Sequence, residues 1–186
     1  MERTLATSAD VSPDGLARLW APYRSAYLGE QGADGASGGD GGTDPDDPFI
    51  DLPSKSDEDA LIVARGEEVF CILNLYPYNP GHMMVLPYRK VASYEDLTDS
   101  ETRELAEFTK KAIRVLRAVS GPDALNVGMN LGRASGGSVP GHLHQHIVPR
   151  WQGDTSFMTV LSGSKVLIQL LGETRELLAT AWQQLD

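Results

Sequence analysis

One short segment carries three of the four histidines in the chain, at alternate positions: His142, His144 and His146. The segment, 141–151, reads GHLHQHIVPRW, and its two-residue hydrophobic period predicts an extended strand. Successive side chains of a strand point to opposite faces, so the three imidazoles share one face and the residues between them share the other. The segment therefore predicts a sheet with a row of imidazoles at one place.

Two chemistries could use such a row. Histidines two apart on a strand can chelate zinc or copper, and a neutral imidazole can also attack a phosphorus or carbonyl centre while its neighbours handle protons. Three alternate side chains span about 13 Å at roughly 3.3 Å per residue, so three of them could share one metal only with distortion. A strand with three surface histidines is the remaining interpretation, but Leu143 and Ile147 already supply a buried face.

The histidine segment resembles a known family. HLHQHIV matches the His-x-His-x-His pattern, followed by two apolar residues, of the histidine triad superfamily of nucleotide hydrolases and transferases, with Gln145 where an apolar residue is usual. Pro149-Arg150 resembles the fragile-histidine-triad branch, which acts on dinucleoside polyphosphates. The run HLHQHIVPRWQGDTSFM is most similar to actinobacterial diadenosine tetraphosphate phosphorylases. The resemblance extends from about Leu19 to Phe157.

The resemblance implies a role for each histidine. The middle one, His144, would attack the α-phosphorus of a nucleotide and form a histidyl-AMP intermediate. Its far ring nitrogen would donate to a fixed acceptor, commonly a backbone carbonyl, so that the attacking lone pair is presented. His142 and His146 would bind the transferring phosphate or the leaving oxygens. His82, the fourth histidine, matches a supporting residue beneath the triad.

The implied reaction is phosphorolysis of diadenosine tetraphosphate to ADP and ATP, with inorganic phosphate as the second substrate. Water in its place would give AMP and ATP, and related enzymes act as nucleoside phosphoramidases. A nucleotide-binding regulatory module without turnover ranks low, because the triad is complete. Ser138 stands where the eukaryotic branch has a longer Gln, which leaves room for phosphate. No cofactor is obligatory, although Mg or Mn could accompany the substrate.

The loop 131–141, LGRASGGSVPG, is rich in glycine and could bring backbone N–H groups to an anion, although most such loops are only connections. The resemblance implies phosphate contacts at Asn130, Gly137 and Ser138, and a ribose contact at Asn74. An Asn at a strand end is also a common turn former.

Two positive side chains and one aromatic side chain complete the candidate site. Arg150 could offset phosphate charge, whereas Arg133 is expected to be a solvated surface residue. Trp151 could cover the site, stack on a base, or belong to the core. A nucleotide base needs an apolar slot. The sequence does not separate residues that would line such a slot from core residues behind it. The candidates for either place are Phe70, Ile72, Leu73, Met83 and Val85.

Composition narrows the class of protein. A chain of 186 residues with 41% hydrophobic residues suffices for one compact domain. A net charge of −10 argues against nucleic-acid binding, which normally needs a basic face. The single Cys71 excludes an intrachain disulfide, and no apolar run is long enough to cross a membrane. We therefore expect a soluble cytoplasmic protein with no membrane partner.

The chain is expected to have three parts. Residues 1–28 form an N-terminal tail with an anchoring segment, in which Trp20 and Tyr23 contact the domain or a partner subunit. Residues 29–48, rich in Gly and Asp, lack large apolar residues and are expected to form a flexible loop. Residues 49–186 form a single nucleotide-binding domain. Relatives often carry a Cys-x-x-Cys pair for a structural zinc near 49–51, and the absence of cysteine there predicts no metal.

The pattern of that domain predicts an α+β fold. Strands are expected at 60–65, 69–74, 83–87 and 124–130, and the histidine strand is the fifth. A capping-box pattern at 98–101 predicts a long amphipathic helix that Gly121 ends, and 165–185 is expected to be mostly helical. Five short-linked strands with a long helix between the third and fourth form an antiparallel sheet. The family resemblance implies the same fold and a homo-oligomer, either a dimer or a tetramer.

Overall fold

The computed structural model describes residues 47–136, 139–154 and 169–185. The chain divides into two units, 1–38 and 39–186, and the first lies wholly outside the described residues. The predicted N-terminal tail with its anchoring segment, and the loop up to residue 46, therefore also lie outside them.

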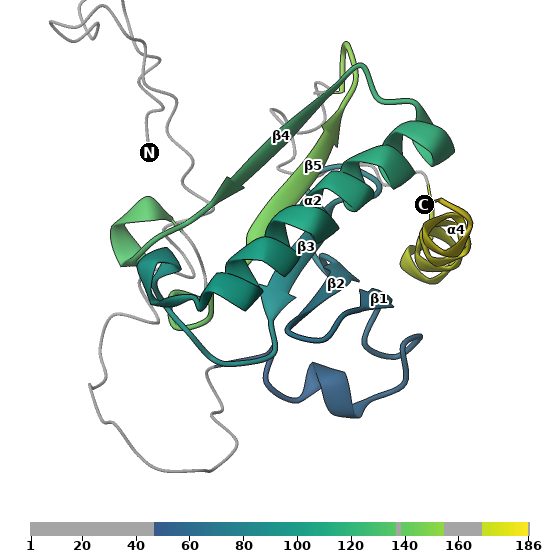
Figure 1. Ribbon diagram of the computed structural model, residues 1–186. Helices are drawn as coiled ribbons and strands as arrows, with labels where there is room; N and C mark the ends of the chain where they lie inside the picture. The colour runs from purple at the N-terminus through teal and green to yellow at the C-terminus, as the bar shows by residue number, and fades with distance from the viewer. Residues whose placement is uncertain (1–46, 137–138, 155–168, 186) are drawn as a thin grey trace, which may run out of the picture. The chain divides into compact units, whose positions relative to one another are not determined.

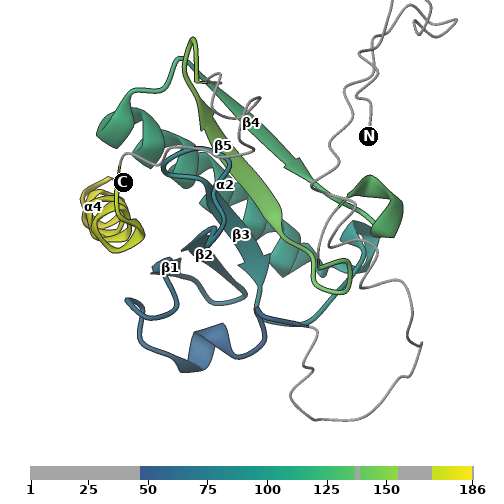
Figure 2. The same ribbon diagram turned by 180° about the vertical axis from the view of Figure 1, so that it is seen from behind.

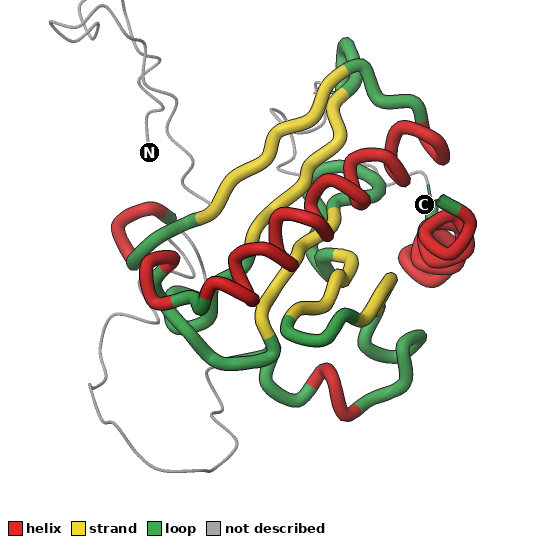
Figure 3. Tube along the Cα trace, in the orientation of Figure 1, coloured by secondary structure: helices red, strands yellow, loops and turns green. Residues whose placement is uncertain are grey.

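A five-stranded antiparallel sheet organises the second unit, as predicted (Figures 1 and 3). The strands are β1 (Ile62–Arg65), β2 (Val69–Leu73), β3 (Met83–Pro87), β4 (Ala124–Met129) and β5 (Gln145–Arg150). Their order across the sheet is β1-β2-β3-β5-β4, so β5 lies between β3 and β4. Short 3-10 turns lie at η2 (Leu52–Ser54), η3 (Tyr94–Asp96) and η4 (Arg133–Ser135).

The long helix α2 (Asp99–Ser120) connects β3 to β4 and begins at the predicted capping box. The Thr98 hydroxyl accepts the Glu101 backbone N–H, and the Glu101 carboxylate accepts the Thr98 N–H. Arg89 also donates to the Glu101 carboxylate, and this hydrogen bond is the main cause that lowers the pKa of Glu101 to about 2. Gly121 ends the helix in the left-handed conformation, at a φ of 52°, that glycine adopts readily.

The C-terminal helix α4 (Leu171–Gln184) packs beside α2 and against β1. The predicted helix began at 165, whereas the observed one begins at 171, and 165–168 lie outside the described residues. Leu178 and Trp182 of α4 are buried in the cluster that α2 forms with the sheet. None of the described helices is long and apolar enough to cross a membrane.

The two faces of the sheet carry two different hydrophobic clusters. Val69, Cys71 and Leu73 of β2 belong with residues of α2 to one cluster, while Phe70 and Ile72 belong to the other. The alternation of strand side chains explains this split. Helix α2 crosses the front of the sheet in Figure 1 and lies behind it in Figure 2, so Figure 2 shows the other face.

Asp47 and Phe49 attach the first described residues to the sheet. Asp47 was predicted to belong to the flexible loop, yet it is 4% exposed and its carboxylate accepts the Phe49 N–H. Phe49 is buried with Ile62 and Ile72 on the second face of the sheet. Asp47 therefore belongs to the packed second unit, where its buried carboxylate and the Phe49 ring hold this segment against the sheet.

Candidate active site

The histidines lie at the junction of β3 and β5, on the face turned away from α2. His146 pairs with Met84 across the two strands, and paired residues point to the same side. Met84 belongs to the second cluster, whereas the next residue, Ile147, belongs to the cluster under α2. The prediction that the imidazoles and the apolar residues alternate between two faces is therefore confirmed for β5.

The observed strand is shorter than the predicted one, which contained the whole histidine row. Strand β5 begins at Gln145, so His142 and His144 precede it, outside the regular sheet. The Leu143 backbone N–H donates to the Val91 carbonyl instead of to β3. The row consequently leaves the regular ladder, which lets each of the three rings have different hydrogen-bond partners.

The His144 ring has a defined tautomer. Its Nδ1 lies 2.7 Å from the carbonyl oxygen of His142, and a carbonyl can only accept, so Nδ1 carries the proton. The lone pair of the neutral ring is therefore on Nε2, and the hydrogen bond through Nδ1 is the one that this ring makes among the described residues. This is the arrangement that the sequence predicted for a nucleophile.

His82 and His146 form a directional pair. The Tyr78 backbone N–H donates to Nδ1 of His82 at 3.1 Å, so the proton of the neutral His82 ring is on Nε2. That N–H donates to Nδ1 of His146 at 2.9 Å. The proton of His146 is then on its Nε2, a buried atom without a hydrogen-bond partner among the described residues. A buried donor kept free beside a nucleophile is suited to bind a substrate oxygen.

His142 differs from the other two histidines because protein acceptors face both of its ring nitrogens. Nδ1 lies 3.0 Å from the Asp47 carboxylate, and Nε2 lies 2.9 Å from the Pro87 carbonyl oxygen. The ring is 1% exposed. His142 was predicted to bind the transferring phosphate, but its hydrogen-bonding atoms are occupied inside the protein. The hydrogen bonds instead indicate that the His142 ring helps to hold the other groups of the site in place.

Burial keeps the reacting rings neutral. It is the main cause that lowers the pKa of His82 to about 3 and that of His146 to about 4, and the neighbouring imidazoles lower both values further. Burial also lowers the pKa of His144, although the hydrogen bond to the His142 carbonyl partly opposes it. His144 can therefore offer its lone pair at and below neutral pH.

Comparisons with known proteins agree with this geometry. The family model described as the HIT domain matches residues 55–153, more than half of the chain. The protein belongs to the HIT family. A Mycobacterium tuberculosis protein named AP-4-A phosphorylase is 56% identical over 169 residues, which cover 91% of this chain and 86% of the relative.

Two further HIT relatives are more distant. A Schizosaccharomyces pombe protein named asymmetrical bis(5'-nucleosyl)-tetraphosphatase is 40% identical over 45% of this chain and 46% of its own length. The crystal structure of a Zn-bound histidine triad family protein from Mycobacterium smegmatis has a TM-score of 0.55 and 26% identity, over 67% of this chain and 84% of that chain. The fold predicted from the HIT resemblance is therefore the observed one.

Two of the predicted binding residues lie near the HIT histidines. The Asn74 amide nitrogen is 3.4 Å from Nδ1 of His82, and its side-chain oxygen accepts the Tyr76 N–H. Asn130 directly follows β4, one position beyond the Met129–Gln145 pair, at the sheet end where His144 lies. Both positions are compatible with the substrate contacts predicted for them.

Other predicted residues are not brought to the histidines. Arg150 donates to both carboxylate oxygens of Asp154 and to the Asn126 side chain, at the far end of β5. The Arg150 hydrogen bond is the main cause that lowers the pKa of Asp154 below its usual range. Arg133 is exposed in η4, and Gly137 and Ser138 lie outside the described residues.

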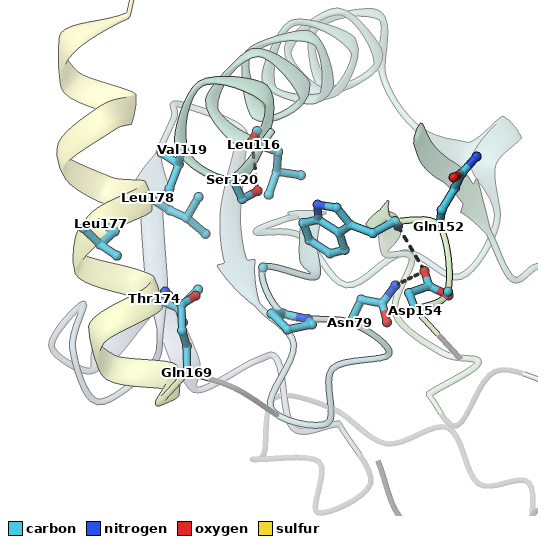
Figure 4. A pocket seen from close by; sticks show the side chains of 14 residues that line it. Asn79, Leu116, Val119, Ser120, Gln152, Asp154, Gln169, Thr174, Leu177 and Leu178 are labelled. Atoms are coloured by element: carbon cyan, nitrogen blue, oxygen red, sulfur yellow. Dashed lines mark hydrogen bonds between the residues drawn. The ribbon is translucent and has the colours of Figure 1, made fainter. Parts of the chain in front are cut away.

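Trp151 lies on the helix side of the sheet. It lines a cavity of about 530 Å³ between the end of α2, the start of α4 and the turn after β5 (Figure 4). Leu116, Leu178 and Asn79 also line this cavity, and Asn79 donates to the Asp154 carboxylate. The described residues therefore give Trp151 a place in this cavity and no contact with the HIT histidines.

The five residues predicted to line or back a base slot separate in the structure. Phe70 and Ile72 are buried on the histidine face. The other three belong to the core under α2: Leu73, Met83 and Val85. The sequence could not separate them because β2 and β3 are fully buried and apolar on both faces.

Three residues of the site were not predicted. The Asp47 carboxylate holds His142, and the Phe49 ring packs against His142 and His144 with centroid distances of 5.6 and 5.2 Å. Tyr78 contacts His82 and His146 with its ring, besides its backbone donation. Asp47 and Phe49 precede the histidine row by more than ninety residues, and no local spacing connects them to it. Phe49 is, however, the first large apolar residue after the Gly-rich loop, which could have marked it as an anchor.

Proposed function

We propose that this protein cleaves diadenosine tetraphosphate by phosphorolysis, giving ADP and ATP through a histidyl-AMP intermediate on His144. The observation that carries the proposal is the His144 tautomer, with Nδ1–H donated to the His142 carbonyl and the lone pair on Nε2. The high identity with the M. tuberculosis protein named AP-4-A phosphorylase supports the choice of substrate.

In the first step, Nε2 of His144 attacks the α-phosphorus, a nitrogen–phosphorus bond forms, and the bond from phosphorus to the bridging oxygen breaks. ATP leaves with that oxygen. The phosphorylated imidazole becomes cationic, and its Nδ1–H remains hydrogen-bonded to the His142 carbonyl. The Nε2–H of His146, fixed by the hydrogen bond from His82, donates to the leaving oxygen.

In the second step, an oxygen of inorganic phosphate attacks the same phosphorus from the side that ATP left. The nitrogen–phosphorus bond breaks, ADP is released, and the neutral His144 ring is restored. Attack by water would give AMP, the second candidate outcome. The similarity to the S. pombe protein named as a tetraphosphatase supports keeping water as that alternative acceptor.

Product analysis separates the two acceptors. The protein is incubated with diadenosine tetraphosphate, with and without inorganic phosphate, and the nucleotides are separated by chromatography. Phosphorolysis predicts ATP together with ADP, and ADP only when phosphate is present. AMP and ATP in equal amounts, irrespective of phosphate, would show a hydrolase instead.

A histidine-based metal-binding protein was the competing class. Among residues 47–136, 139–154 and 169–185, no group of three or more His, Cys, Asp or Glu side chains is arranged to hold a metal ion. The directional hydrogen bond from His82 to His146 also uses ring nitrogens that a metal would need. We propose that any Mg or Mn enters with the polyphosphate.

Substrate contacts follow from the same placement. We propose that Asn74 binds ribose and Asn130 binds the α-phosphate, because Asn74 contacts His82 and Asn130 lies beside the end of β5 that His144 precedes. Gly137 and Ser138, outside the described residues, are proposed as phosphate contacts from their sequence positions alone.

We also propose that the protein works in the cytoplasm as a homo-oligomer. The support for self-association is β4, an edge strand whose residues are mostly exposed, including Val127 at 46%. An exposed, regular edge can pair with a second copy and continue the sheet. Size-exclusion chromatography with light scattering on the wild type and on Val127→Lys tests this. A dimer or tetramer that the substitution weakens is expected, and a monomeric wild type would contradict it.

A further inference from the structure

Asp47 is the only carboxylate among the described residues whose contacts reach the histidine row, and the reaction described above gives it no role. Its side chain is almost fully buried. One oxygen accepts the Phe49 N–H, and the other lies 3.0 Å from Nδ1 of His142 and 3.8 Å from the Lys90 ammonium. A buried carboxylate is costly unless it is paired, so the pairing with His142 is a structural requirement of the site.

The partners of His142 determine its protonation. A neutral imidazole carries one ring proton, but His142 faces the Asp47 carboxylate on Nδ1 and the Pro87 carbonyl on Nε2. A carbonyl oxygen and a carboxylate both accept hydrogen bonds. To donate to both at once, His142 would need two ring protons, as in an imidazolium.

The consequence reaches the nucleophile through the backbone. With its ring fixed on both sides, His142 holds its own carbonyl oxygen 2.7 Å from Nδ1 of His144. The Phe49 ring, whose backbone N–H is bonded to Asp47, packs against His144 as well. Asp47 thus supports both the hydrogen bond that sets the His144 tautomer and the ring that limits its rotation.

We propose that Asp47 is a positioning residue for the nucleophile, which holds His142 as an imidazolium and thereby fixes the ring and tautomer of His144. The proposal rests on the proposed function for its kinetic consequence, whereas the protonation of the two rings is independent of any substrate. Asp47 is expected to act on the chemical step and to leave substrate binding unchanged, because the described structure places it behind the histidine row.

The kinetic test uses Asp47→Asn, which keeps the shape and an oxygen for the Phe49 N–H but removes the charge. The matched control is Asp51→Asn, an exposed carboxylate close by that touches no histidine. We expect kcat for ATP release from diadenosine tetraphosphate to fall by about 10- to 100-fold in Asp47→Asn, the usual range for a supporting partner. KM should stay within about twofold, and the control should match the wild type.

The second readout is the nitrogen-15 spectrum of the histidine rings at neutral pH, recorded without substrate. In the wild type, His142 is expected to show both ring nitrogens protonated and His144 only Nδ1 protonated. In Asp47→Asn, His142 should show one proton, and His144 should show a mixture of tautomers. Circular dichroism confirms that the variant is folded, and the wild-type spectrum tests the proposal even if the variant is not.

Either of two results would overturn the proposal: wild-type kcat in a folded Asp47→Asn variant, or a singly protonated His142 in the wild type. If the wild type released no ATP from diadenosine tetraphosphate, the proposed function would fail instead. The ring spectra would still decide whether Asp47 positions His144.

Discussion

The two faces of one sheet are built from the same strands and serve different purposes. Under α2, the inward residues of β2, β3 and β5 form a hydrocarbon cluster with buried Leu116 and Val115 of the helix. On the opposite face, the alternate residues of the same strands support four histidines, and each histidine is held by a specific hydrogen bond. One face contributes mainly to stability, and the other holds the chemistry.

This difference teaches that neighbouring residues on one strand can have unrelated roles. His146 and Ile147 are adjacent, yet one lies in the site and the other in the core. The interactions that hold the two faces in place also differ in kind. The core depends on buried area and packing, whereas the site depends on the direction of a few hydrogen bonds. Substitutions on the two faces should therefore affect different measurements.

The largest expected effect is that of His144→Ala. The variant lacks the only group that can form the intermediate, so kcat/KM for diadenosine tetraphosphate should fall by on the order of 10⁴-fold or more. The melting temperature should fall only modestly, because the variant loses one ring contact with Phe49 and one hydrogen bond but no member of either hydrophobic cluster. Turnover at the wild-type rate would refute the assignment of the site to this face.

The matched pair Ile147→Ala and His146→Ala tests the separation of the faces most sharply. Ile147→Ala removes fully buried hydrocarbon and should lower the free energy of unfolding by about 3 kcal/mol, with activity largely kept at low temperature. His146→Ala should lower kcat by about 10²- to 10³-fold and the unfolding free energy by only about 1 kcal/mol. Stability is measured by urea denaturation. Equal losses of unfolding free energy in the two variants would contradict the separation of roles between the two faces.

The pH dependence of kcat/KM should show a smaller effect, which arises from the histidine face alone. Burial lowers the pKa of His144, so the neutral nucleophile persists below the ordinary value of 6.5. At a pH of about 5.5, kcat/KM should therefore fall by less than the roughly tenfold loss expected of an ordinary imidazole. A full tenfold loss with a midpoint at or above 6.5 would show that His144 is not buried as described.

The stability of the fold limits the pH range of that measurement. The pKa values of His82 and His146 are about 3 and 4 in the folded protein, below the value of about 6.5 in an unfolded chain. The unfolded state then binds more protons between these limits, so the stability that these groups contribute is present above pH 6.5 and is lost as the pH falls toward 4 and 3. Circular dichroism at each pH shows where the protein remains folded.

The smallest expected effect lies on the helix side. Thr98→Ala removes the side-chain cap of α2 and should lower the free energy of unfolding by about 1 kcal/mol. The capping box lies away from the histidines, so kcat and KM should match the wild type. A kinetic defect in a folded Thr98→Ala protein would mean that the two faces are coupled.

The features that could be predicted from the sequence are those with a local pattern. The two-residue period predicted β5, the capping box predicted α2, and the family resemblance of the histidine segment predicted the site and its nucleophile. Strand alternation places Leu73 and Phe70 on different faces. The sequence could not tell which of the two faces meets α2, because β2 is apolar and buried on both faces.

Contacts between distant segments could not be predicted for a different reason. Asp47 reaches His142 over 95 residues, and Arg150 reaches Asn126 over 24 residues. Neither contact is marked by a periodic pattern in the sequence. The sequence therefore suggested a site role for Arg150, which is hydrogen-bonded to Asn126 and Asp154 instead. It gave no indication of Asp47, whose carboxylate contacts His142.

The most direct test of the account is to identify the residue that carries AMP during turnover. The protein is mixed with diadenosine tetraphosphate in the absence of phosphate, quenched under alkaline conditions that preserve phosphoramidates, digested, and analysed by mass spectrometry. The account predicts one AMP group on the peptide that contains 141–151, attached at His144, and its disappearance as ADP when phosphate is added before the quench. An AMP group on another residue, or none while ATP is still released in a burst, would contradict it.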